Sequence, residues 1–229
     1  MPADNGARPL PVAAVLFDLD GTLADSAGDL AAALNRIRAD HGLPPVPVAD
    51  LRAHASSGAR GLIGAGMGIT PDDARYGELR DAFLAYYQLC LAETTTLFEG
   101  VAPLLDAIEM RGLRWGIVTN KHARFTVPVV AALSLAQRAA VVVSGDTTPH
   151  AKPHPAPLLH AAASLRVASG RCVYVGDDLR DVEAGRAAGM ATIVADYGYM
   201  GTAGDPGTWP ATGRIARPLE LLDWLPERI

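Results

Sequence analysis

Cysteine is scarce in this chain: its 229 residues include two, Cys90 and Cys172, which lie far apart. Neither has the closely spaced Cys or His neighbours of a zinc site, and one distant pair does not make a disulfide framework. Cys172 opens an apolar run, so we interpret it as a core residue. Nothing in this cysteine usage requires an oxidising compartment.

Long apolar runs are also missing. The first residues, MPADNGARPLP, lack the apolar segment of a signal peptide. No uninterrupted apolar stretch in the sequence reaches transmembrane length. We therefore expect a cytoplasmic protein with no membrane partner.

Basic residues do not exceed acidic ones: 20 Lys and Arg against 25 Asp and Glu give a net charge of −5. Proteins that bind nucleic acid generally carry a basic surface, so we expect no nucleic-acid partner. A small anionic substrate stays compatible with this charge, because local charges and a metal dominate inside a cleft. With 49% hydrophobic and 20% charged residues, the composition is typical of a globular protein with a substantial core.

Helices alternate with short apolar strands over most of the chain. The expected strands are residues 12–17, 113–118, 140–144, 172–175 and 191–194. This alternation predicts parallel strands joined by right-handed crossovers. Residues 26–97 show helical periodicity instead and contain no convincing strand, so we interpret them as a helical insertion. The predicted fold class is α/β, with a parallel sheet and an inserted helical segment.

Two aspartates separated by one residue follow the first strand, in VLFDLDGTL. Residues i and i+2 of a strand point to the same side, so Asp18 and Asp20 can face one site at the carboxyl end of the strand. Ligands of open α/β sheets usually bind there, and a cation would relieve the repulsion between the carboxylates. Asp18 can then attack an electrophile while Asp20 transfers protons. The alternative is a solvated turn after a strand.

Polar residues also follow the next two strands of the crossover pattern. Thr119 and Asn120 offer a hydroxyl and a backbone N–H suited to phosphoryl oxygens, or they form a simple strand-to-helix cap. Lys152 can neutralise both a phosphate and a carboxylate, although a lone lysine is usually a surface residue. Because Thr119-Asn120 and Lys152 follow successive strands of the predicted sheet, they support the interpretation that Asp18 and Asp20 belong to a site.

An acidic cluster follows the strand at 172–175, in GDDLRD. Asp177, with Asp178 and Asp181 nearby, supplies the hard oxygen ligands that Mg²⁺ prefers. An acidic first helical turn, favoured by the helix dipole, is the alternative. The cluster indicates a magnesium site at the same edge of the sheet.

As an ordered set, these motifs resemble those of the haloacid dehalogenase superfamily phosphatases. The matching stretches are DLDGT (18–22), TN (119–120), KP (152–153) and GDDLRD (176–181). The resemblance implies a Rossmann-like catalytic core over 1–25 and 98–229, with a mobile α-helical cap over 26–97. It also implies a Mg²⁺ cofactor, a small phosphorylated substrate, and a monomer or homodimer.

The same resemblance implies roles for individual residues. Asp18 would be the nucleophile and Asp20 the general acid and then base. Asp18, the backbone carbonyl of Asp20, and Asp177 would bind Mg²⁺, while Thr119 and Lys152 would hold the phosphoryl group. The two remaining acidic residues of the last motif would orient the metal; they are Asp178 and Asp181.

The overall pattern is similar to that of phosphoglycolate phosphatases. Several phrases resemble the phosphatases of N-acetylmuramic acid 6-phosphate, among them LRWGIVTNK and GDDLRDVEAGRAAGM. Both substrates combine a phosphate with a carboxylate, and the sequence does not choose between them. A phosphomutase of the same superfamily and a phospho-accepting signalling domain are the less favoured alternatives. Dehalogenation is not expected, because dehalogenases lack an aspartate at the position of Asp20.

Substrate specificity is expected to come from the cap, because the core motifs contact only the phosphoryl group. The candidate segment is the polar turn Ser56-Ser57-Gly58-Ala59-Arg60. Gly58 lets the backbone approach a substrate, with Ser57 beside it. Arg60 can pair with a substrate carboxylate through two hydrogen bonds. The alternative is a turn that only connects two helices, with Arg60 in solvent.

Overall fold

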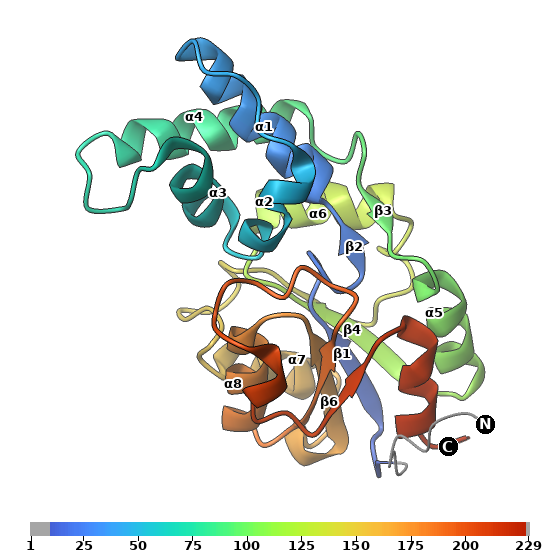
Figure 1. Ribbon diagram of the computed structural model, residues 1–229. Helices are drawn as coiled ribbons and strands as arrows, with labels where there is room; N and C mark the ends of the chain where they lie inside the picture. The colour runs from blue at the N-terminus through green and yellow to red at the C-terminus, as the bar shows by residue number, and fades with distance from the viewer. Residues whose placement is uncertain (1–9, 228–229) are drawn as a thin grey trace, which may run out of the picture.

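Six parallel strands form the central sheet of the computed structural model, which describes residues 10–227 (Figure 1). The strands are β1 (Ala14–Phe17), β4 (Arg114–Val118), β5 (Val142–Val143), β6 (Cys172–Gly176), β7 (Ala191–Ala195) and β8 (Gly213–Ile215). Their order is β5-β4-β1-β6-β7-β8, and every neighbouring pair is parallel. The predicted α/β class is confirmed.

Helices cover both faces of this sheet. The side chains of β1 are fully buried and alternate between two apolar clusters, as a strand covered on both faces requires. The cluster on one face includes residues of α5 (Val101–Met110), α6 (Ala123–Ala132) and the 3-10 helix η3 (Pro218–Trp224). The cluster on the other face includes residues of α7 (Ala156–Ser164) and α8 (Leu179–Ala187).

Four helices stand above the carboxyl edge of the sheet (Figure 1). They are α1 (Ala27–Asp40), α2 (Val48–Ala55), α3 (Gly58–Met67) and α4 (Tyr76–Leu89). Their apolar faces build a separate cluster, joined from the sheet side by Phe125 and Tyr199. The two short strands β2 (Ala24–Asp25) and β3 (Thr96–Leu97) pair antiparallel beside the predicted borders at 26 and 97. We call these four helices the cap; the exact domain borders stay a prediction.

Some elements differ from the expectation. The strand expected over 140–144 is limited to two residues, and β8 is an additional edge strand too short to give a periodic pattern. The last helix of the described residues, η3, is of the 3-10 type. Two further single-turn 3-10 helices connect larger elements, η1 (Ser169–Arg171) and η2 (Pro206–Thr208).

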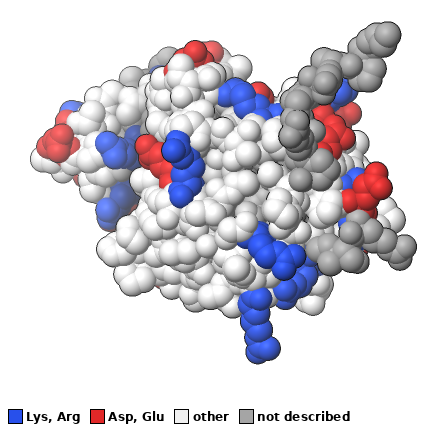
Figure 2. All heavy atoms as spheres, turned by 90° about the horizontal axis from the view of Figure 1, so that it is seen from below, with Lys and Arg blue, Asp and Glu red and all other residues white. Residues whose placement is uncertain are grey.

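The surface of the sheet domain away from the cap carries scattered charges. On the face shown in Figure 2, the basic and acidic side chains of the described residues lie singly or in small groups among uncharged ones. No helix within residues 10–227 combines the length and apolar character needed to cross a bilayer.

Candidate active site

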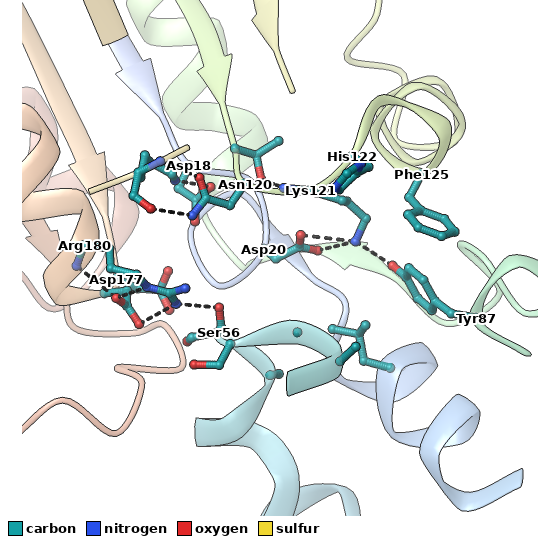
Figure 3. A pocket seen from close by; sticks show the side chains of 18 of the residues that line it. Asp18, Asp20, Ser56, Tyr87, Asn120, Lys121, His122, Phe125, Asp177 and Arg180 are labelled. Atoms are coloured by element: carbon teal, nitrogen blue, oxygen red, sulfur yellow. Dashed lines mark hydrogen bonds and ion pairs between the residues drawn. The ribbon is translucent and has the colours of Figure 1, made fainter. Parts of the chain in front are cut away.

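The carboxyl ends of three adjacent strands bring the predicted residues together. Asp18 directly follows β1, Thr119 follows β4 and Asp177 follows β6, and these strands are neighbours in the order β4-β1-β6. All three side chains line one cavity between the sheet and the cap. Asp18 and Asp177 are labelled in Figure 3. The topology therefore assembles in space what the sequence separates by more than 150 residues.

This cavity has a volume of about 310 Å³ and two unlike walls. The wall from the sheet side carries most of the charged groups, including Asp18, Asp20, Lys152 and Asp177, whereas the cap contributes Arg80. The wall from the cap is largely apolar and includes Leu30, Ala55, Ala59, Phe83 and Leu84. A charged group on a ligand would face the sheet, and the rest of the ligand would face the cap.

Lys152 is the cation closest to Asp18. Its Nζ lies 2.8 Å from Asp18 Oδ1 and donates to Asp181 Oδ1 at 2.7 Å, to the Tyr174 hydroxyl at 2.8 Å and to the Val118 carbonyl at 3.1 Å. The lysine is 5% exposed, so its charge is held in place by these partners rather than by water. The structure excludes the surface alternative for this residue.

The Asp177 side chain packs closely against two glycines, Gly21 and Gly198. A Cβ on Gly21 would lie 2.2 Å from Asp177 Oδ2, and one on Gly198 would lie 2.4 Å from Asp177 Cβ. The Thr22 hydroxyl donates to Oδ1 at 3.1 Å and the Tyr199 backbone N–H donates to Oδ2 at 2.9 Å. The carboxylate is thus oriented by fixed donors, with no basic side chain among them.

The residues present fit a divalent cation. Carboxylate oxygens of Asp18, Asp177 and Asp181 lie within 4.8 Å of one another, and Asp18 Oδ1 is buried without a hydrogen bond of ordinary geometry. Three closely spaced carboxylates, of which Asp177 and Asp181 are buried, leave an excess of negative charge over the one lysine, which hard cations such as Mg²⁺ offset. Asp181 belongs to this trio, whereas the predicted set had the backbone carbonyl of Asp20 and gave Asp181 an orienting role.

Burial raises the pKa of two of these carboxylates, Asp18 and Asp177. It raises the pKa of Asp18 from 3.8 to about 6; the Lys152 charge opposes the rise and the Asp181 charge adds to it. Burial also raises the pKa of Asp177 well above its ordinary value, reinforced by the charges of Asp18 and Asp181. Ionising both Asp18 and Asp177 without a cation is therefore costly.

The stability of the metal-free protein should fall as the pH rises from 4 to 6. In that interval folded Asp18, with a pKa of about 6, keeps a proton that the unfolded chain loses at 3.8. This difference lowers the free energy of unfolding by up to about 3 kcal/mol. Urea unfolding in EDTA of the wild type and of Asp18→Asn, which cannot titrate, measures the effect. A stability difference between them that does not change with pH would contradict it.

Asp20 is held by two donors that the sequence did not reveal. The Ser26 hydroxyl donates to Oδ1 at 2.5 Å, and Lys121 Nζ donates to Oδ1 at 2.9 Å and to Oδ2 at 3.1 Å. Lys121 also donates to the hydroxyl of Tyr87 on α4 at 2.6 Å (Figure 3). Lys121 directly follows the predicted Thr119-Asn120 pair in the sequence, and this adjacency is the feature that could have indicated its place in the site.

Asn120 fixes the loop that carries Lys152. Its side-chain amide donates to the Lys152 carbonyl and accepts from the Lys152 backbone N–H, both at 2.9 Å. Thr119 is buried, and its hydroxyl accepts from the Lys121 backbone N–H at 3.2 Å. The predicted roles in phosphoryl binding stay proposals, with Asn120 already committed to positioning Lys152 through its side chain.

Asp178 turns away from the carboxylate trio toward Arg180. It begins α8 as the cap of a reciprocal capping box with Asp181 and lies 2.8 Å from Arg180 Nε. Burial would raise the pKa of Asp178, but the hydrogen bond and charge of Arg180 hold it below its ordinary value. Arg180 also donates to the Ser56 carbonyl of the cap at 2.6 Å. The sheet and the cap are therefore hydrogen-bonded at the cavity rim.

Ser57 and Gly58 line the cavity, as expected of a specificity segment, but Arg60 does not. The helix α3 begins at Gly58, so Arg60 belongs to its first turn and is exposed, whereas Ala59 faces the cavity. A contact between Arg60 and a substrate carboxylate is not available in this arrangement. The arginines that do line the cavity are Arg80 and Arg180.

The fold and the site define an α/β protein with a cluster of carboxylates at the carboxyl edge of a parallel sheet. A family model described as haloacid dehalogenase-like hydrolase matches residues 15–195. The chain therefore belongs to the haloacid dehalogenase-like hydrolase family, and within it to the phosphoric monoester hydrolases.

Curated relatives cover nearly the whole chain. An N-acetylmuramic acid 6-phosphate phosphatase of Pseudomonas aeruginosa is 43% identical over 212 residues, which are 93% of this chain and 94% of the relative. A phosphoglycolate phosphatase of Xanthomonas campestris pv. campestris is also 43% identical, over 213 residues, covering 93% of this chain and 95% of the relative. The predicted resemblance to both groups is confirmed, and identity does not separate them.

A solved structure shows the same fold. The crystal structure of a predicted phosphoglycolate phosphatase from Haemophilus somnus superposes with a TM-score of 0.81, covering 93% of this chain and 97% of that chain. Its sequence identity is 24%, so the likeness concerns the fold alone.

Proposed function

We propose that this chain is a Mg²⁺-dependent phosphatase that hydrolyses a small phosphomonoester through a phospho-aspartate intermediate, in the manner of a phosphoglycolate phosphatase. The observation that carries the proposal is the position of Asp18, at the end of β1 with Lys152 Nζ 2.8 Å away and Asp177 and Asp181 beside it. A nucleophilic carboxylate next to a fixed cation can accept a phosphoryl group whose charge the cation balances.

The reaction proceeds in two halves. An oxygen of Asp18 attacks phosphorus, the bond to the leaving oxygen breaks, and Asp20 gives that oxygen a proton. Asp20 then takes a proton from water, whose oxygen attacks the phosphorus, releasing inorganic phosphate and restoring Asp18. Lys152 and Thr119 would hold the phosphoryl oxygens throughout.

The carboxylates at the edge of the sheet would hold Mg²⁺ near a bound phosphoryl group. Asp18 and Asp177 would hold it, together with the backbone carbonyl of Asp20, and Asp181 lies close enough to orient it. When bound, it neutralises charge on the phosphoryl oxygens. The buried carboxylates could then stay ionised beside a dianionic substrate.

The cavity favours a second candidate substrate, an amino-sugar phosphate such as N-acetylmuramic acid 6-phosphate. Its volume of about 310 Å³ reaches the lower end of the ~300–1,000 Å³ typical of pockets for drug-sized ligands, more than a two-carbon acid fills. The apolar cap wall of Leu30, Phe83 and Leu84 also suits a substrate with carbon groups beyond the phosphate. Initial rates of phosphate release with Mg²⁺ from both compounds decide between them.

Narrowing the cavity should penalise the larger substrate. Ala59 lines the cap wall, and Ala59→Leu would fill part of the space for a leaving group. We expect kcat/KM for N-acetylmuramic acid 6-phosphate to fall about 10- to 100-fold, with that for phosphoglycolate within about threefold of wild type. Ala65→Leu, on the exposed side of the same helix, is the control. Equal losses on both substrates would show that the cap wall does not contact the leaving group.

A further inference from the structure

The buried ammonium of Lys121 has partners on both sides of the cavity. Its side chain is 7% exposed and donates to both oxygens of Asp20 on the sheet side and to the Tyr87 hydroxyl on the cap side. An ammonium group has three N–H donors, so these three acceptors satisfy it completely. Burying a charge is costly without such partners, so the lysine is fixed only where all three meet.

The backbone of Lys121 and the side chain of Tyr87 are both held in place by further contacts. The Lys121 carbonyl accepts from the Gly145 N–H at 2.8 Å and from the Thr126 hydroxyl at 2.9 Å, so the backbone has little freedom. Tyr87 is 2% exposed, and its ring lies 5.3 Å from that of Phe125 on α6. The Lys121 Nζ also sits 4.7 Å from the centre of the Tyr87 ring. The hydroxyl of Tyr87 is therefore a rigid acceptor supplied by the cap.

We propose that Tyr87 and Lys121 are positioning residues for proton transfer: Tyr87 fixes the Lys121 ammonium, and Lys121 holds the Asp20 carboxylate in the orientation from which it serves the leaving oxygen and then water. This inference rests on the proposed function and adds a link between the cap and the proton-transfer group. α4 thus acts on Asp20 through Lys121, because its Tyr87 hydroxyl is the third acceptor of the ammonium group that pairs with Asp20. The Ser26 hydroxyl, 2.5 Å from Asp20 Oδ1, holds the carboxylate from a second direction.

A competing role for Lys121 is direct recognition of a carboxylate on the substrate. It lines the cavity and carries the right charge. The two roles predict losses on different substrates. If Lys121 positions Asp20, its loss should slow release of every leaving group that needs a proton. If Lys121 binds a substrate carboxylate, its loss should affect only substrates that carry one.

Tyr87→Phe tests the proposal with the least disturbance, because it removes one oxygen and keeps the ring against Phe125. Tyr86→Phe is a matched control on the same helix: the Tyr86 hydroxyl donates to Asp40 at 2.5 Å, within the cap and at its surface. The measurement is the rate of alcohol release in a single turnover with Mg²⁺. Three substrates are compared: 2-phosphoglycolate, glycerol 3-phosphate and p-nitrophenyl phosphate.

Tyr87→Phe should slow release of both alkyl alcohols about tenfold, since the hydrogen bond it deletes involves a charged donor. Release of p-nitrophenolate, which leaves without a proton, should stay within about twofold, as should KM for all three substrates. Tyr86→Phe should match the wild type throughout. Lys121→Gln should repeat the Tyr87→Phe pattern with a larger loss, provided that its melting temperature shows a folded protein.

Each contrary result has its own meaning. A loss confined to 2-phosphoglycolate would assign Lys121 to the substrate carboxylate and overturn the positioning role. Equal losses on alkyl and aryl phosphates, or no difference between Tyr87→Phe and Tyr86→Phe, would overturn it as well. If the wild type released no alcohol from any phosphomonoester, including the amino-sugar phosphate, the proposed function itself would fail.

Discussion

Replacing Asp18 with asparagine is expected to lower phosphate release by about 10⁴-fold or more, the scale of losing a covalent nucleophile. An amide oxygen is a far poorer nucleophile than a carboxylate, and the side chain keeps almost the same shape. The neighbouring carboxylates of the trio are held by other partners, Asp177 by Thr22 and Tyr199 and Asp181 by Lys152 and Tyr174, so we do not expect them to replace Asp18 in the attack.

The variant should nevertheless fold. Lys152 keeps Asp181 at 2.7 Å, so its charge stays paired, and the trio loses one of its mutually repelling carboxylates. The melting temperature without metal should therefore equal or exceed that of the wild type.

Two measurements check this prediction. Phosphate release with Mg²⁺ gives the rate, and the mass of the acid-quenched protein should show a phosphorylated species in the wild type alone. Asp72→Asn, at an exposed position outside the cavity, controls for the chemistry of the substitution. If folded Asp18→Asn kept a tenth of the wild-type rate, Asp18 would not be the nucleophile.

The sequence predicted the residues whose place depends on strand ends. Asp18, Thr119 and Asp177 each directly follow a buried strand, and parallel strands bring their carboxyl ends to one edge whatever the loops do. The cavity side of the sheet could therefore be predicted without knowing a single tertiary contact. The buried state of Lys152 follows less directly, because β5 ends nine residues before it.

Contacts between the sheet and the cap could not be predicted in this way. Lys121 contacts Asp20, which is 101 residues away in the sequence, and Tyr87, which is 34 residues away. No local sequence pattern predicts contacts at either separation. The prediction for Arg60 depended on the residue at which α3 begins. Because the helix begins at Gly58, Ala59 faces the cavity and Arg60 faces solvent. A shift of one position around a helix changes the direction of a side chain by about 100°.

Asp177→Asn should weaken Mg²⁺ binding by at least about 100-fold, beyond the 10- to 100-fold typical of losing a group that only orients a metal ligand. The substitution fits the site. The amide oxygen can accept from the Tyr199 N–H, and the amide nitrogen can donate to Thr22, whose hydroxyl both donates and accepts. The loss should therefore come from the missing charge rather than from the fold.

Phosphate release measured against MgCl₂ concentration should show this weakening as a shifted curve. The wild type should reach full rate at low MgCl₂, whereas Asp177→Asn should need at least about 100-fold more and recover part of the rate there. The rise in melting temperature on adding MgCl₂ should shift in parallel, because a ligand stabilises the state that binds it.

Asp178→Asn is the control for the neighbouring carboxylate. Asp178 pairs with Arg180 at 2.8 Å, and asparagine can still begin α8, so its MgCl₂ curve should stay within about tenfold of the wild type. Full activity of the wild type after chelation would contradict the metal requirement. An Asp177→Asn curve that overlays the wild type would instead remove Asp177 from the ligands, leaving Asp18 and Asp181 as the carboxylates that face the cation.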